Sequence, residues 1–129
     1  MDNSKKTKRK ILVTQALPYA NAPLHLGHIL EAVQTDIWAR FHNLNNNECL
    51  FFCADDTHGT PVMLKANEIG VKPEELIADV YKDHKSTYKL YDINFANFYS
   101  THSDENKKFS EYIYELSLIH ISEPTRRSV

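Results

Sequence analysis

Short apolar runs alternate with longer segments in which apolar residues recur at helical spacing, and this alternation restricts the fold more than any other feature of the sequence. The apolar runs at residues 11–14 and 49–54 have the length of buried strands. Between them, from Leu26, apolar residues recur with the period of an amphipathic helix. The predicted core-facing stripe of this helix is Ile29, Val33, Ile37, Phe41 and Leu44, widened by Leu30 and Trp38.

The same alternation continues through the second half of the chain. Thr60 as N-cap and Pro61 as first helical residue predict a helix start, and Gly70 predicts its end. A further helix is expected from Pro73, with an apolar side made of Leu76, Ile77, Val80, His84, Tyr88 and Tyr91. We expect a third strand at residues 93–99. A last helix should follow, capped by Ser103, with Phe109, Tyr112, Ile113 and Leu116 on one face.

Strands that alternate with helices predict an α/β fold, with a parallel sheet covered by helices on both faces. Ligands of such sheets bind beyond the carboxyl ends of the strands, which directs attention to the loops at residues 16–28 and 55–60.

The first of these loops places His25 and His28 on either side of Gly27, where the predicted helix begins. A helix N-terminus presents unpaired N–H groups and positive partial charge, which favour phosphate. Histidines at this position can stabilise charge that develops on phosphorus, and glycine leaves the backbone open to close approach. Taken alone, such a pair is also compatible with a metal site or with surface histidines.

The second loop begins with Asp55 and Asp56, directly after the strand at 49–54, and turns at Gly59. Two carboxylates at a strand end predict a cation site, either for Mg²⁺ or for the ammonium group of a substrate. Turn formation by aspartate is the alternative interpretation.

Composition and charge limit the class of protein. With 42% hydrophobic and 25% charged residues the chain is typical of globular proteins. A net charge of −2 argues against nucleic-acid binding by the whole surface, so an RNA partner would meet local basic patches or other segments. No membrane span and no secretory signal are expected. The basic residues 1–9 are predicted to form a flexible tail.

The two cysteines, Cys49 and Cys53, fall on the same face of the second predicted strand. They are too few for a disulfide framework or for paired zinc knuckles, so no metal is expected in this chain. We expect reduced, buried thiols in a cytoplasmic protein.

Three stretches resemble signature sequences of the methionyl-tRNA synthetases. They are TQALPYANAPLHLGH at residues 14–28, FFCADDTHGTP at 51–61 and FYSTHSDEN at 98–106. HLGH resembles the HIGH-type motif of all class I synthetases and related nucleotidyl transferases, and the other stretches narrow the resemblance. It covers residues 10–117 and implies the first half of a Rossmann-type parallel-sheet nucleotide-binding catalytic domain.

The activity implied by this resemblance is that of a methionine–tRNA ligase. Methionine and ATP, the latter with Mg²⁺, would give methionyl-adenylate and pyrophosphate, and the methionyl group would then pass to tRNA(Met). No residue is modified covalently, so catalysis would consist of positioning and electrostatic stabilisation.

The resemblance also implies roles for individual residues. The catalytic pair would be His25 and His28. ATP would be bound by Asn21, His25, Gly27, His28 and Glu31. Methionine would be bound by Ala16, Leu17, Tyr19 and Asp56, with Asp56 paired with the α-ammonium group. Asp55 and His58 would line the site without an assigned role. Ala22 stands where the family often has glycine, which would cost about 1 kcal/mol if that position had a positive φ.

Several parts of the family pattern do not occur in these residues. They are the connective insert, in which alone zinc is expected, the second half of the nucleotide fold, the KMSKS-type lysine loop and the anticodon-binding domain. We therefore expect this N-terminal fragment to be inactive alone. Residues 118–129 depart from the pattern and are expected to be a read-through tail. A truncated paralogue that binds a partner, or another HIGH-motif nucleotidyl transferase, are the alternatives.

Overall fold

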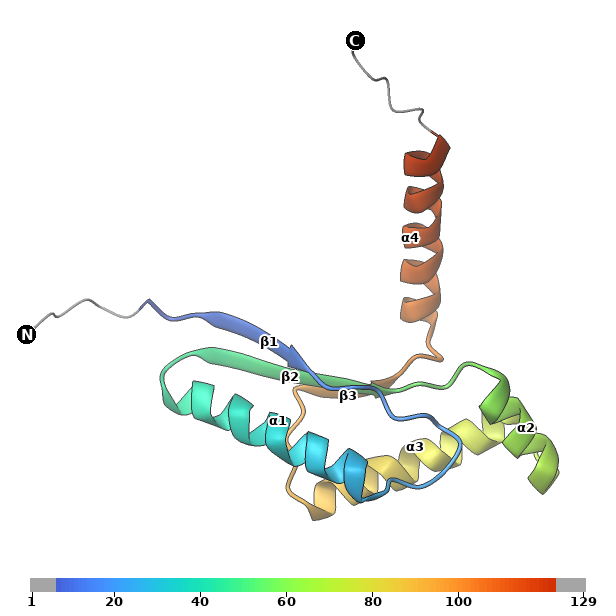
Figure 1. The fold of residues 1–129 in the computed structure, drawn as a ribbon, viewed down its shortest axis with the longest axis horizontal. Coiled ribbons are helices and arrows are strands. Elements are labelled where there is room, and N and C mark those ends of the chain that lie inside the picture. The colour runs from blue at the N-terminus through green and yellow to red at the C-terminus, as the bar shows by residue number, and fades with distance from the viewer. Residues whose placement is uncertain (1–6, 123–129) are drawn as a thin grey trace, which may run out of the picture.

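The computed structural model describes residues 7–122, with side chains as far as residue 119. Three parallel strands form one sheet in the order β1 (Lys10–Thr14), β2 (Glu48–Asp55) and β3 (Asn97–Ser100). Helix α1 (Leu26–Leu44) connects β1 to β2, and α2 (Thr60–Ile69) with α3 (Pro73–Leu90) connects β2 to β3. Helix α4 (Asp104–Ser122) follows (Figure 1). The predicted α/β fold with a parallel sheet is confirmed.

Helices cover only one face of this sheet within residues 7–122, so the prediction of two covered faces is wrong there. Both α1 and α3 lie on the same side of the strands (Figure 1), where Cys53 of β2 packs with residues of both helices. The opposite face exposes Leu12 and Leu50, at 70% and 43% of their surface. The strand order advances without reversing, and right-handed crossovers that advance in one direction place their helices on one side.

Helix α1 packs by a different face than the sequence predicts. Its buried residues are Ile29, Ala32, Asp36 and Ala39. Most of the predicted stripe is exposed, namely Leu30, Ile37, Trp38, Phe41 and Leu44. Alanine lets a helix approach a sheet closely, and Asp36 accepts a hydrogen bond from the Asn94 backbone N–H at 3.0 Å. The prediction failed because α1 carries apolar residues on more than one face.

The ends of the next helices follow local capping. Helix α2 begins at Thr60, so Gly59 rather than Thr60 is its N-cap, and Gly70 ends it in the left-handed conformation, as predicted. Helix α3 begins at Pro73, and Leu76, Val80, His84 and Tyr88 of its predicted apolar side are buried. Tyr91, the C-cap residue, is 53% exposed instead.

The third strand is shorter than predicted. Residues 93–96 form a connection in which the Ile93 N–H bonds to the Tyr88 carbonyl and the Ala96 N–H to the Phe51 carbonyl. This segment does not extend the strand, and the side chains of Ile93 and Phe95 pack beneath the sheet. Pairing with β2 therefore begins only at Asn97.

Helix α4 projects away from the sheet (Figure 1). Ser103 caps it as predicted, because its Oγ accepts the Asn106 N–H at 3.2 Å. The helix continues to Ser122, into the segment 118–129, of which residues 123–129 lie outside the described residues, as do residues 1–6 of the predicted basic tail. Its predicted apolar face is exposed, at Phe109, Tyr112, Ile113 and Leu116.

Both cysteines are free and buried, which confirms the predicted burial of the two thiols. Burial raises the pKa of the Cys53 thiol to about 12 and also raises that of Cys49. Both thiols are therefore protonated and unreactive at neutral pH. Within residues 7–122, no helix combines the length and apolar character needed to cross a membrane.

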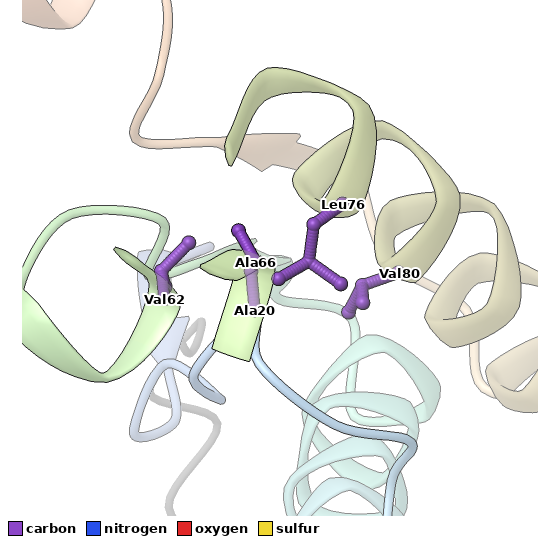
Figure 2. Packing of buried hydrophobic residues seen from close by; sticks show 5 residues of the cluster. All are labelled: Ala20, Val62, Ala66, Leu76 and Val80. Atoms are coloured by element: carbon purple, nitrogen blue, oxygen red, sulfur yellow. The ribbon is translucent and has the colours of Figure 1, made fainter. Parts of the chain in front are cut away.

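A small apolar cluster fixes the first of the two loops against the helices. Ala20, which is fully buried, lies among Val62 and Ala66 of α2 and Leu76 and Val80 of α3 (Figure 2). The loop is thereby held at the end of the sheet where the strands terminate.

We expect the Gly70→Ala substitution to lower the free energy of unfolding by roughly 1–2 kcal/mol, because Gly70 has a φ of 73° and alanine is strained there. Nothing lies within 4 Å of an added Cβ, so the loss reports backbone strain alone. Urea denaturation measures it. Gly70→Asn is the matched control, since asparagine tolerates this conformation better; equal losses for both substitutions would contradict the explanation.

Candidate active site

The two loops singled out in the sequence pair with each other beyond the ends of β1 and β2. The Asp56 N–H donates to the Pro18 carbonyl at 2.8 Å, and the Ala20 N–H donates to the Asp56 carbonyl at 2.9 Å. Tyr19 and Asp56 thus form an isolated parallel bridge. The parallel register of the sheet is continued into the loops, which brings the predicted site residues of both to one edge.

Thr101, directly after β3, joins the same edge. Its Oγ1 accepts the Thr57 N–H at 2.9 Å, and its own N–H donates to the Asp55 carbonyl at 3.0 Å. The ring of His58 also reaches the Thr101 carbonyl, at 3.2 Å. Sequence reasoning missed Thr101 as a site residue, although its place after a third strand was a usable signal.

The histidine pair lies at the N-terminus of α1, where each ring caps the backbone. His25 Nδ1 accepts the Gly27 N–H at 3.1 Å, and His28 Nδ1 accepts the His25 N–H at 3.3 Å. The rings stack with centroids 3.8 Å apart. A neutral imidazole whose Nδ1 accepts carries its proton on Nε2. No described residue bonds to either Nε2 atom, so two N–H donors are left for a ligand beside the positive end of the helix.

Gly27 is needed by this cap. An added Cβ would lie 2.9 Å from Cε1 and 3.0 Å from Nδ1 of His25, so a side chain would displace the ring. This is a reason for glycine additional to the predicted approach of a ligand.

The charge of His28 is disfavoured. Burial lowers the pKa of His28 first of all, the nearby His25 and His84 lower it further, and Glu31 opposes them. Because the pKa falls below its ordinary value of 6.5, His28 is a neutral donor at pH 7.

Other predicted site residues are distributed around these two loops. Glu31 Oε1 accepts the Ala16 N–H at 2.8 Å, which ties α1 to the start of the first loop. Tyr19 and Leu17 expose 49% and 41% of their surface. Tyr19 approaches the second loop, since an added Cβ at Gly59 would lie 4.0 Å from its ring.

Two polar members of the predicted set make no side-chain hydrogen bonds of their own with the described residues. Asn21 and Asp56 are half-buried, and neither side chain has a hydrogen-bond or ion-pair partner among the described residues. Their polar atoms are thus free to meet a ligand. No group of three or more histidine, cysteine or acidic side chains in residues 7–119 is placed to hold a metal ion.

Asp55 lies beneath the site and is fully buried. Its Oδ1 is 2.7 Å from Nδ1 of His84, and Nε2 of His84 is 2.9 Å from the Ala22 carbonyl oxygen. Sequence reasoning counted His84 only as a member of an apolar stripe, although a titratable residue in such a stripe was itself a signal. The φ of Ala22 is not positive, so alanine carries no backbone strain there.

This fold is that of the Rossmann-like catalytic domain of a class I aminoacyl-tRNA synthetase. A family model described as tRNA synthetases class I (M) matches residues 11–120, and the chain belongs to that family.

Solved structures with the same fold agree. Two structures of Mycobacterium tuberculosis methionyl-tRNA synthetase with methionyl-adenylate superpose with a TM-score of 0.81 and 28% identity, over 83% of this chain. The LeuRS of Agrobacterium radiobacter K84, in a ternary complex with tRNA and LeuAMS, has a TM-score of 0.76 over 88% of this chain and 15% of its own length. At 22% identity, that likeness shows the fold alone. The chain spans 21% of the length of the M. tuberculosis enzyme.

We expect the ring of His28 to titrate with a midpoint below 6.5 in histidine-selective NMR, because its folded pKa is lowered. A lowered pKa means that its contribution to stability is present above about pH 6.5 and is lost as the pH falls through the folded value. His25→Asn keeps a capping acceptor and removes a neighbouring charge, so the midpoint should move toward 6.5. A midpoint above 6.5 in the unaltered protein would contradict the lowered pKa of His28.

Proposed function

We propose that the protein is a methionine–tRNA ligase and that this chain forms the first half of its ATP and amino-acid site. The observation that carries the proposal is that two kinds of group occur together at one edge of the sheet. Two histidines at the start of α1 have unused Nε2 donors, and the Asp56 carboxylate beside the neighbouring strand end has no protein partner in the described residues. Donors for phosphate and an acceptor for an ammonium group therefore belong to two loops that pair with each other at this edge.

In the proposed first step, a carboxylate oxygen of methionine forms a bond to the α-phosphorus of ATP. The bond from that phosphorus to the bridging oxygen breaks, and pyrophosphate leaves with the electron pair. Negative charge grows on the phosphate oxygens as this happens. His25 and His28 would donate to those oxygens from Nε2, while the helix N-terminus adds positive potential. Asn21 and Gly27 would contribute to nucleotide binding at the same helix start.

The amino acid would lie across the paired loops. Asp56 would bind its α-ammonium group, and the exposed faces of Leu17 and Tyr19 would contact the thioether side chain. Ala16 would contribute backbone close by, in the position that Glu31 fixes through the Ala16 N–H. His58 would line the far side of the second loop.

The second step would transfer the methionyl group to the 3′ end of tRNA(Met), with loss of AMP. The match to the M. tuberculosis enzyme covers 83% of this chain but only 21% of that enzyme, so segments beyond these residues would complete the site and bind the tRNA. ATP would enter with Mg²⁺ as substrate. The buried, unpaired thiols fit a protein that acts in the cytoplasm.

In the full-length protein, methionine should stimulate the exchange of labelled pyrophosphate into ATP, and the other amino acids should not. Stimulation by a different amino acid would favour another class I synthetase. Absence of exchange with every amino acid, in a folded protein, would favour a paralogue that binds a partner without catalysis.

Asp56→Asn should raise the KM for methionine by about 10- to 100-fold, because one charge-assisted hydrogen bond is worth roughly 1.5–3 kcal/mol. The KM for ATP should change little, and initial-rate kinetics of the exchange reaction measure both constants. The control is Asp79→Asn, which removes a carboxylate that is 78% exposed on α3 and paired with Lys82. If Asp56→Asn and Asp79→Asn behave alike, the ammonium contact is not made by Asp56.

A further inference from the structure

His84 occupies a position that core packing does not explain. It lies in the second half of α3 with 0% of its surface exposed, and both ring nitrogens are hydrogen-bonded. One partner, Asp55, precedes the carboxylate proposed to bind the amino acid. The other partner, the Ala22 carbonyl, belongs to the loop that leads into the histidine pair. We propose that His84 is a positioning residue for methionine activation, which holds the first loop in register with the end of β2. This inference rests on the proposed function.

The chemistry of the two partners determines what the ring must do. A carbonyl oxygen only accepts, so Nε2 of His84 carries a proton and donates to Ala22. An ionised Asp55 also only accepts, which requires a second proton on Nδ1. Burial disfavours the charge and is the largest single effect, but the hydrogen bonds to Asp55 and Ala22 and the charges of Asp55 and Asp83 outweigh it. The pKa of His84 is therefore raised above its ordinary value.

Asp55 depends on this histidine more than a surface acid would. Both side chains are fully buried, and Asp55 Oδ2 has no hydrogen-bond partner among the described residues. His84 thus provides the only side-chain hydrogen bond and the compensating charge that the carboxylate has there. Removal of one partner of a buried pair leaves the other uncompensated, and the local backbone must rearrange or take up water.

The backbone near Asp55 carries the rest of the site. Asp55 accepts from Thr101, and the next residue, Asp56, pairs with Pro18 and Ala20. On the loop side, Ala20 is anchored by apolar packing (Figure 2). Ala22 is anchored by its hydrogen bond with His84. Asn21 lies between these two anchors, and His25 follows shortly after the second. Loss of the Ala22 anchor would free the loop segment that positions Asn21 and His25.

His84→Gln tests the proposal in the full-length protein. Glutamine presents one donor and one acceptor to two partners that both accept, so it cannot satisfy both. The kcat for methionine activation, taken as the maximal rate divided by the concentration of active sites from adenylate burst titration, should fall by about 10- to 100-fold. Counting active sites removes the contribution of unfolded protein. Hydrogen exchange at the amides of Ala20 and Asp56 should become faster.

Two further variants separate positioning from stability. Asp36→Asn changes another buried acid, on α1, that bonds to Arg40 and to the Asn94 N–H. It should lower the melting temperature and leave both kcat per active site and the two amides unchanged. The double variant Asp55→Asn with His84→Gln restores complementary partners, since the asparagine NH₂ can donate to the glutamine oxygen while the glutamine NH₂ donates to Ala22. It should recover part of the kcat lost in His84→Gln.

These measurements test the positioning role of His84 and the proposed function separately. If kcat per active site and the exchange of Ala20 and Asp56 are unchanged in His84→Gln, His84 does not position the loop. If His84→Gln does not fold, the double variant decides, because reduced activity per active site without any effect on these amides would equally overturn the inference. Absence of methionine-dependent exchange in the unaltered protein would refute the proposed function, whereas the amide measurement would still report whether His84 holds the loop.

Discussion

The arrangement at the carboxyl end of the sheet depends on one constraint, the continuation of parallel pairing past the ends of β1 and β2. Asp56 donates to Pro18 and accepts from Ala20, so the two loops leave the sheet in a fixed register. Ordering each residue of a free loop would cost about 1–2 kcal/mol. Because the backbone makes these bonds, the side chains of Tyr19 and Asp56 are left available at the surface of the site.

Beneath this pairing the fold keeps a histidine and an aspartate out of water. Such a pair adds little net stability compared with apolar residues of the same size, because removing both charges from water is costly. What the pair contributes is directional contact. Hydrogen bonds of 2.7 and 2.9 Å connect the His84 ring to Asp55 at the end of β2 and to Ala22 in the first loop. The apolar cluster around Ala20 holds the same loop without such directional contacts (Figure 2). Packing thus stabilises the loop, and the polar bridge sets where it lies.

Most local features of the fold could be predicted from the sequence. Gly70 ends α2 and Ser103 caps the start of α4, both as predicted, since capping depends on neighbouring residues only. The predicted loops also lie together, because parallel strands end at the same edge. Residues 93–96 are predicted to be part of a strand, but Ile93 is still bonded to Tyr88 in the turn after α3, and the ladder with β2 begins only at Asn97.

The sequence by itself determined the order of strands and helices, the family signatures and the residues at the two loops, because periodicity, caps and motifs are short-range properties. Only the tertiary structure decided which face of α1 is buried, which face of the sheet is covered, and what His84 contacts. Its two partners lie 29 and 62 positions away in the chain. No pattern within one element encodes such contacts; they follow from the direction of the crossovers, which brings α3 beneath the first loop.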